Sequence, residues 1–149
     1  MKANNKGFTL IELLAIIVIL AIIAVITVPV ILNIIDDARN GADKNSVIGY
    51  GKAVELAYTQ YLYEESLGSD NSHVASSSEA SQSVTNQDGK VISITIDGGS
   101  TPVNLKIDFE GANVVCGGNN TITSGKVSLN SCTVDGGSKT YSYSDGAVE

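Results

Sequence analysis

A continuous apolar run dominates the first part of the chain. Every residue from 13 to 26 is Leu, Ala, Ile or Val, and the run continues with few interruptions to Ile35. As a helix, residues 13–35 would be about 35 Å long, which is enough to cross a hydrocarbon core of about 30 Å. Two lysines precede the run and two aspartates follow it directly. By the positive-inside rule, this pattern predicts a single membrane helix with a cytoplasmic N-terminus.

Glu12 is the charged residue that interrupts this apolar segment, close to its start. A carboxylate inside a membrane helix costs about 3 kcal/mol and therefore indicates a functional site. The segment is longer than the apolar core of a cleavable secretory signal, and no A-x-A site with suitable flanks follows it. A plain single-span anchor is the simpler alternative, but it assigns no role to Glu12 or to the Gly7-Phe8 pair.

A second apolar rhythm follows the Asn40-Gly41 pair. Large apolar residues recur there at steps of three and four, at Val47, Tyr50, Val54, Tyr58, Tyr61 and Leu62. This spacing predicts an amphipathic helix that continues the membrane helix to about Leu67, with Gly68 as its C-cap. We expect the tyrosines of this segment, Tyr63 included, to pack in a core, because aromatic rings bury large areas against a sheet. Gly49 and Gly51 would allow that packing to be close.

The pattern changes twice beyond this helix. Residues 68–88 are rich in Ser, Asn and Asp, which predicts an exposed loop that also holds the single histidine, His73. From Lys90 onward the apolar period becomes two, which predicts a strand at residues 103–109 and a hairpin partner at residues 91–96. Further short strands are expected at residues 112–116, 126–129, 131–134 and 139–143. The predicted fold class is α+β, with a long N-terminal helix packed on one face of an antiparallel sheet.

Cys116 and Cys132 lie in the part of the chain that this topology places outside the cell. An even number of cysteines in an exported domain favours a disulfide, although two buried reduced thiols are the alternative. A bridge closing a loop of about 15 residues would contribute roughly 3 kcal/mol to stability. A structural zinc site is not expected, because one histidine cannot complete the ligand set with two thiols.

Composition and motifs argue against two classes of function, nucleic-acid binding and catalysis. The net charge is −7, from 9 basic and 16 acidic residues, which argues against nucleic acid as the primary partner. The chain contains no Walker loop and no nucleophile elbow, and its single histidine lies in a polar loop. We therefore expect no catalytic residue, no cofactor and no enzymatic activity.

The segment Gly7-Phe8-Thr9-Leu10-Ile11-Glu12-Leu13-Leu14 resembles the processing site of type IV prepilins and pseudopilins. The resemblance implies that a prepilin peptidase cuts between Gly7 and Phe8 and methylates the new amine of Phe8. It also implies that Glu12 pairs with the Phe8 amine of a neighbouring subunit during assembly, whereas pairing within one chain is the simpler alternative. Glu12 lies four residues from Phe8 and therefore on the same helix face.

Pro29 is the third residue to which the resemblance assigns a role in assembly. Proline lacks an N–H, so the carbonyl of Val25 would lose its helical partner. Thr27 could supply a compensating hydroxyl, or the helix could kink. In pilins a proline at the matching place marks a stretch that loses helicity in the filament. The family often has a glycine earlier in that stretch, where this chain has Ala21.

Asp135 and Asp145 are candidate calcium ligands, because some secretion pseudopilins hold calcium in a late loop. Each aspartate is followed by glycine, as are Asp88 and Asp97. Turn chemistry accounts for all four pairs, and no EF-hand or calcium-binding repeat is present. We therefore expect no metal site.

Together these observations predict a structural subunit of a type IV pilus that serves adhesion, motility or DNA uptake. The expected segments are a leader (1–7), a hydrophobic transmembrane and assembly helix (8–35), its amphipathic continuation (36–67), an exposed loop (68–89) and an antiparallel sheet domain (90–149). The expected partners are copies of itself, other pilins, prepilin peptidase, the pilus assembly machinery and, before assembly, membrane lipid. The chain would be a single-pass membrane protein first and part of an extracellular filament afterwards.

Two alternatives stay open. A pseudopilin of a type II secretion or competence system would share every N-terminal feature. A membrane-anchored extracellular binding module that never polymerises would share the apolar helix and the outer domain.

Overall fold

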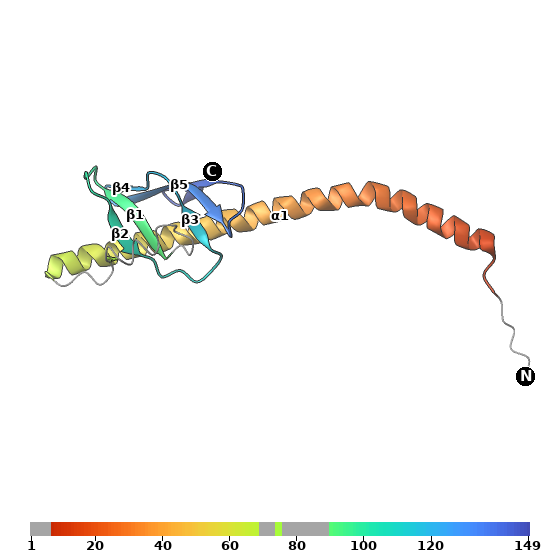
Figure 1. The fold of residues 1–149 in the computed structure, drawn as a ribbon, viewed down its shortest axis with the longest axis horizontal. Coiled ribbons are helices and arrows are strands. Elements are labelled where there is room, and N and C mark those ends of the chain that lie inside the picture. The colour runs from red at the N-terminus through yellow and green to blue at the C-terminus, as the bar shows by residue number, and fades with distance from the viewer. Residues whose placement is uncertain (1–6, 69–73, 76–89) are drawn as a thin grey trace, which may run out of the picture. The chain divides into compact units, whose positions relative to one another are not determined.

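One long helix precedes a small sheet in the computed structural model, which describes residues 7–68, 74–75 and 90–149 (Figure 1). The elements are α1 (Leu10–Leu67), β1 (Val91–Ile96), β2 (Val103–Lys106), β3 (Val114–Cys116), β4 (Thr121–Thr123), β5 (Lys126–Val134), β6 (Tyr141–Ser144) and β7 (Ala147–Val148). Two compact units divide the chain, Met1–Asn40 and Gly41–Glu149, and α1 contributes to both. The α+β class predicted from the sequence is confirmed. Residues 1–6 of the predicted leader and His73 lie outside the described residues.

In the first unit α1 has no core of its own. The large apolar side chains of residues 10–35 are 41–82% exposed. The helix continues through Pro29 and curves along this half (Figure 1). The hydroxyl of Thr27 donates to the carbonyl of Ile23 at 2.9 Å, which excludes the first of the two alternatives, compensation of the Val25 carbonyl by Thr27. A threonine hydroxyl in a helix reaches the carbonyl four residues back more readily than one two residues back.

In the second unit α1 packs on the sheet through one face. The buried residues of the helix are Val47, Tyr50, Gly51, Val54, Ala57 and Tyr58, which confirms the amphipathic rhythm. Tyr61 is half-buried, but Tyr63 is 66% exposed and Leu62 is 43% exposed, so the sequence prediction was wrong for these two. Tyr63 lies five positions after Tyr58 and therefore on a different helix face, whereas Leu62, four positions after Tyr58, shares its face and is still exposed. The helix ends as predicted, because Gly68 has φ +63° and its N–H donates to the Glu65 carbonyl.

The described strands form a sheet in the order β2-β1-β4-β5-β6-β7, with β3 paired to β5. The hairpin of β1 and β2 is antiparallel as predicted. The sheet is mostly antiparallel, but β1 and β4 pair in parallel, with Thr95 opposite Thr121. Val74 and Ala75, which the sequence assigned to the exposed loop, contact the outer edge of β2 instead.

Several strand boundaries differ from those predicted. Residues 126–134 form the single strand β5, whose pairing with β6 shifts register between Leu129 and Cys132. Ser131 has φ +53° at this irregularity. The irregularity lies where the apolar pattern predicted a break between strands at residues 126–129 and 131–134. β2 ends at Lys106, three residues before the predicted end, and β4 and β7 were not predicted.

The core of the second unit lies between the helix face and the sheet. Its largest fully buried side chains include Tyr50, Tyr143, Ile92, Ile94, Leu105, Ile122 and Leu129. Cys116 and Cys132 stand opposite each other on β3 and β5 and form a disulfide, so the predicted bridge is confirmed. Both cysteines are buried. Because they are directly paired across β3 and β5, the bridge holds these two core strands in register.

Asn120 is a polar core residue that the sequence prediction missed. Its side chain is buried, and its Oδ1 accepts from the backbone N–H of Asn130 on β5 at 3.0 Å. Its Nδ2 approaches the carbonyls of Ser93 on β1 at 3.5 Å and of Cys116 on β3 at 3.4 Å. One amide side chain thus contacts three strands, and buried polar groups of this kind are stable only when they are hydrogen-bonded.

Candidate functional site

The predicted site is the N-terminal end of α1, where three hydrogen bonds join Thr9 and Glu12. Glu12 Oε2 accepts from the backbone N–H of Thr9 at 2.9 Å and from its hydroxyl at 2.8 Å. In return, the Glu12 N–H donates to Thr9 Oγ1 at 3.3 Å. The Thr9 carbonyl accepts the helical bond from Leu13 at 3.2 Å. This arrangement is a capping box with Thr9 as the N-cap.

The capping box defines the local contacts of Glu12 in this structure. Its carboxylate lies in the first turn, where the helix dipole favours a negative charge. Within the part of the chain that the structure describes, its Oε1 accepts no hydrogen bond. Both hydrogen bonds to its carboxylate come from Thr9, and the N–H of Phe8 is not among the donors. One carboxylate oxygen therefore holds the cap while the other is open to a further donor.

The role of Thr9 was missed in the sequence prediction, although the signal was present. A threonine followed three residues later by glutamate, at the start of an apolar run, is the pattern of a capping box. The sequence reasoning assigned Glu12 to the amine of Phe8 and left Thr9 without a function. Both side chains belong to the same local motif, so no tertiary contact was needed to find it.

Gly7 and Phe8 lie just outside the helix. Residues 7–9 have no regular secondary structure, and α1 begins at Leu10. Phe8 is 81% exposed, and nothing lies within 4 Å of a Cβ built on Gly7. The peptide bond between Gly7 and Phe8 is therefore accessible from several sides.

The apolar surface of residues 10–35 extends from this site along the helix. The stretch is long and apolar enough to cross a membrane. An exposed apolar surface of this extent marks a site for lipid or for another protein. Glu12 stands near its N-terminal end and Pro29 inside its second half.

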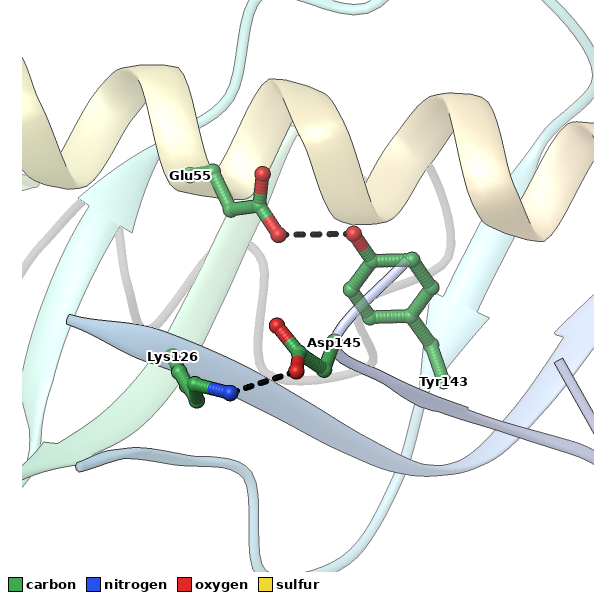
Figure 2. A network of polar contacts seen from close by, with 4 residues as sticks. All are labelled: Glu55, Lys126, Tyr143 and Asp145. Atoms are coloured by element: carbon green, nitrogen blue, oxygen red, sulfur yellow. Dashed lines mark hydrogen bonds and ion pairs between the residues drawn. The ribbon is translucent and has the colours of Figure 1, made fainter. Parts of the chain in front are cut away.

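The calcium candidates serve as turn residues. Asp135 has φ +49° and its Oδ1 accepts from the backbone N–H of Asn113 at 2.8 Å. Asp145 has φ +51°, and its Oδ2 lies 2.5 Å from Lys126 Nζ (Figure 2). Each precedes a glycine that also has a positive φ, as hairpin turns of this type require. Among the described residues, no three His, Cys, Asp or Glu side chains gather as metal ligands would.

Two phenol–carboxylate contacts hold β6 against α1 in the second unit. Tyr143 donates from Oη to Glu55 Oε1 at 2.7 Å (Figure 2), and Tyr141 donates to Asp43 Oδ2 at 3.1 Å. Burial, reinforced by the adjacent Glu55 carboxylate, raises the pKa of Tyr143 to about 12. Burial and Asp43 raise the pKa of Tyr141 as well. Both phenols are therefore neutral donors at physiological pH.

The N-terminal site lies within a segment that matches a known family model. No curated protein and no solved structure matches the chain. Residues 2–28, which include Gly7, Phe8, Thr9 and Glu12, match the family model of the prokaryotic N-terminal methylation motif. The chain therefore carries the N-terminal methylation motif that is characteristic of type IV pilins and pseudopilins.

Proposed function

We propose that the chain is a prepilin whose mature form begins at Phe8 and is a structural subunit of a type IV pilus. One observation carries this proposal: an exposed apolar helix surface has a single carboxylate near its N-terminal end, within the methylation motif. The mature chain would be held in the membrane by this helix before assembly. It would then enter an extracellular filament that serves adhesion, motility or DNA uptake.

The geometry at Glu12 supports pairing between subunits. Cleavage between Gly7 and Phe8 would create a charged amine on Phe8 near the membrane surface. A lone carboxylate in a membrane helix costs about 3 kcal/mol, and a nearby cation reduces that cost. Because Thr9 engages Oε2 of Glu12, Oε1 can accept from the Phe8 amine of a neighbouring subunit without loss of the helix cap. This pairing gives the helices a reason to associate beyond apolar contact.

The same proposal assigns no catalytic role to the chain. Its partners are other copies, related pilins, the peptidase that removes the leader, and the membrane assembly machinery. Pro29 would act in assembly by weakening the helix where it must adapt to its neighbours.

Glu12→Gln tests the pairing without removing the cap, because glutamine also serves at this position of a capping box. We expect the variant to insert into the membrane and to be cut after Gly7, but to form few or no filaments. The assay is electron microscopy of cells that express the variant and lack the native protein, with an antibody to the second unit. Normal filaments built from this variant would refute the pairing.

Mass spectrometry of the native N-terminus separates the alternatives. A mature chain that begins with methylated Phe8 supports the proposal, whereas an uncut Met1 indicates a membrane anchor that does not polymerise. Processed chains that form no long surface fibres at native expression would indicate a pseudopilin.

A further inference from the structure

The change from irregular to helical backbone occurs at Thr9, two residues after Gly7. Residues 7–9 are irregular, and Leu10 is the first residue of α1. The peptide bond between Gly7 and Phe8 therefore lies outside the helix, with Phe8 two residues before the first helical residue. A shift of the helix start by three residues toward the N-terminus would place that bond in the first helical turn.

The Thr9–Glu12 capping box explains why the helix starts where it does. The first N–H groups of a helix have no helical acceptor and must be satisfied by other groups. Here Thr9 Oγ1 accepts from the Glu12 N–H, and Glu12 Oε2 accepts from the Thr9 N–H. If these acceptors were removed in apolar surroundings, the nearest replacements would be the carbonyls of preceding residues. The helix would then extend through Phe8 and Gly7.

Hydrolysis of the Gly7–Phe8 bond depends on this boundary. A water molecule adds across the amide, so that Gly7 becomes a carboxylate and Phe8 acquires the free amine. A peptide bond in the first helical turn has its C=O engaged by the N–H four residues later and its backbone held in helical geometry, so the turn must be unwound before a peptidase can align the bond. In this chain the bond is already outside the helix, and Phe8 is 81% exposed.

We infer that the Thr9 hydroxyl is a positioning group for leader removal: with Glu12 it stops the helix and presents the Gly7–Phe8 bond to the peptidase. This inference rests on the proposed function, because it requires that the chain be a peptidase substrate. It assigns two roles to Glu12 at two stages. Before cleavage Oε2 completes the cap, and after cleavage Oε1 is open to a neighbouring amine.

The test compares three full-length precursors with the native one in detergent micelles. Thr9→Val keeps the shape of the side chain and removes the hydroxyl, whereas Thr9→Ser keeps the cap. Thr27→Val makes the same chemical change in mid-helix, where the hydroxyl donates to the Ile23 carbonyl. Membranes that contain the prepilin peptidase are added, and mass spectrometry follows loss of the leader. Carbon chemical shifts of Phe8 report whether the residue is helical.

Because an N-cap favours its helix start by a factor of about five, we expect Thr9→Val to be cut about five-fold more slowly. Its Phe8 shifts should become helical, while Thr9→Ser and Thr27→Val should match the native chain in both measurements. An unchanged or faster rate for Thr9→Val would overturn the inference. So would slower cleavage with irregular Phe8, because the hydroxyl would then act by contact with the enzyme. A native chain that is never cut would instead contradict the proposed function.

Discussion

Gly51 on α1 faces the ring of Tyr143 on β6, and its replacement by alanine tests how closely the helix packs on the sheet. A Cβ built on Gly51 would lie 2.5–2.6 Å from three ring atoms of Tyr143. Carbon atoms normally approach to about 3.5–4.0 Å, so the overlap is about 1 Å. The ring cannot easily move away, because it is fully buried and its hydroxyl is bonded to Glu55 on the same helix.

The expected cost in stability is the balance of one favourable and two unfavourable terms. Alanine should gain about 1 kcal/mol over glycine in helix propensity. Overpacking a close contact typically costs about 1–3 kcal/mol, and loss of the Tyr143–Glu55 hydrogen bond would add about 1 kcal/mol. We therefore expect a net loss of about 2 kcal/mol. For a unit of about 110 residues this corresponds to a fall of roughly 8–12 °C in Tm.

The assay is thermal and urea unfolding of the full chain in detergent, monitored by tyrosine fluorescence. The chain has no tryptophan, and all six of its tyrosines lie in the second unit, so the signal reports on that unit. Gly41→Ala is the matched control, because Gly41 is also helical and nothing lies within 4 Å of its added Cβ. It should be neutral or stabilising by up to about 1 kcal/mol.

A double variant isolates the contact. In a Tyr143→Leu background the clash partner is gone, so Gly51→Ala should cost much less, which a double-mutant cycle would report as coupling of about 1 kcal/mol or more. If Gly51→Ala raised the unfolding midpoint as Gly41→Ala does, the close approach of the helix to Tyr143 would be refuted.

Two further predictions concern buried polar groups. The pKa of Tyr143 is about 12 in the folded chain, whereas the pKa of a tyrosine in an unfolded chain is about 10. The neutral phenol of Tyr143 therefore stabilises the fold fully below pH 10, and this stabilisation is lost as the pH rises through 12. Tyr143→Phe should flatten the fall in stability over that window in a pH series of urea unfolding; an unchanged slope would contradict the raised pKa. Asn120→Ala should lower stability by about 1–3 kcal/mol, because it leaves the Asn130 N–H without its buried acceptor. The exposed neighbour Asn119→Ala should change it by less than about 0.5 kcal/mol, and equal effects would show that the Asn120 contacts contribute little.

The sequence alone determined the features that arise from neighbouring residues. The apolar run, the single carboxylate, the helical rhythm ending at Gly68 and the alternation of β2 are all periodic or local patterns. The Asp-Gly turns belong to the same class, because a positive φ is a property of one or two residues. The Thr9–Glu12 cap could have been read in the same way. These features predicted the α+β class and the N-terminal methylation motif, and both are confirmed.

Only the tertiary structure decided which segments meet. The parallel pairing of β1 with β4 joins residues 26 positions apart, such as Thr95 and Thr121, and no local period specifies it. The exposure of Tyr63 depends on which face of the helix the sheet covers, and the burial of Asn120 depends on three strands converging on one side chain. Local propensity acts through adjacent backbone groups, whereas burial depends on the whole set of long-range contacts. The sequence pattern therefore indicated the elements, and packing selected their partners.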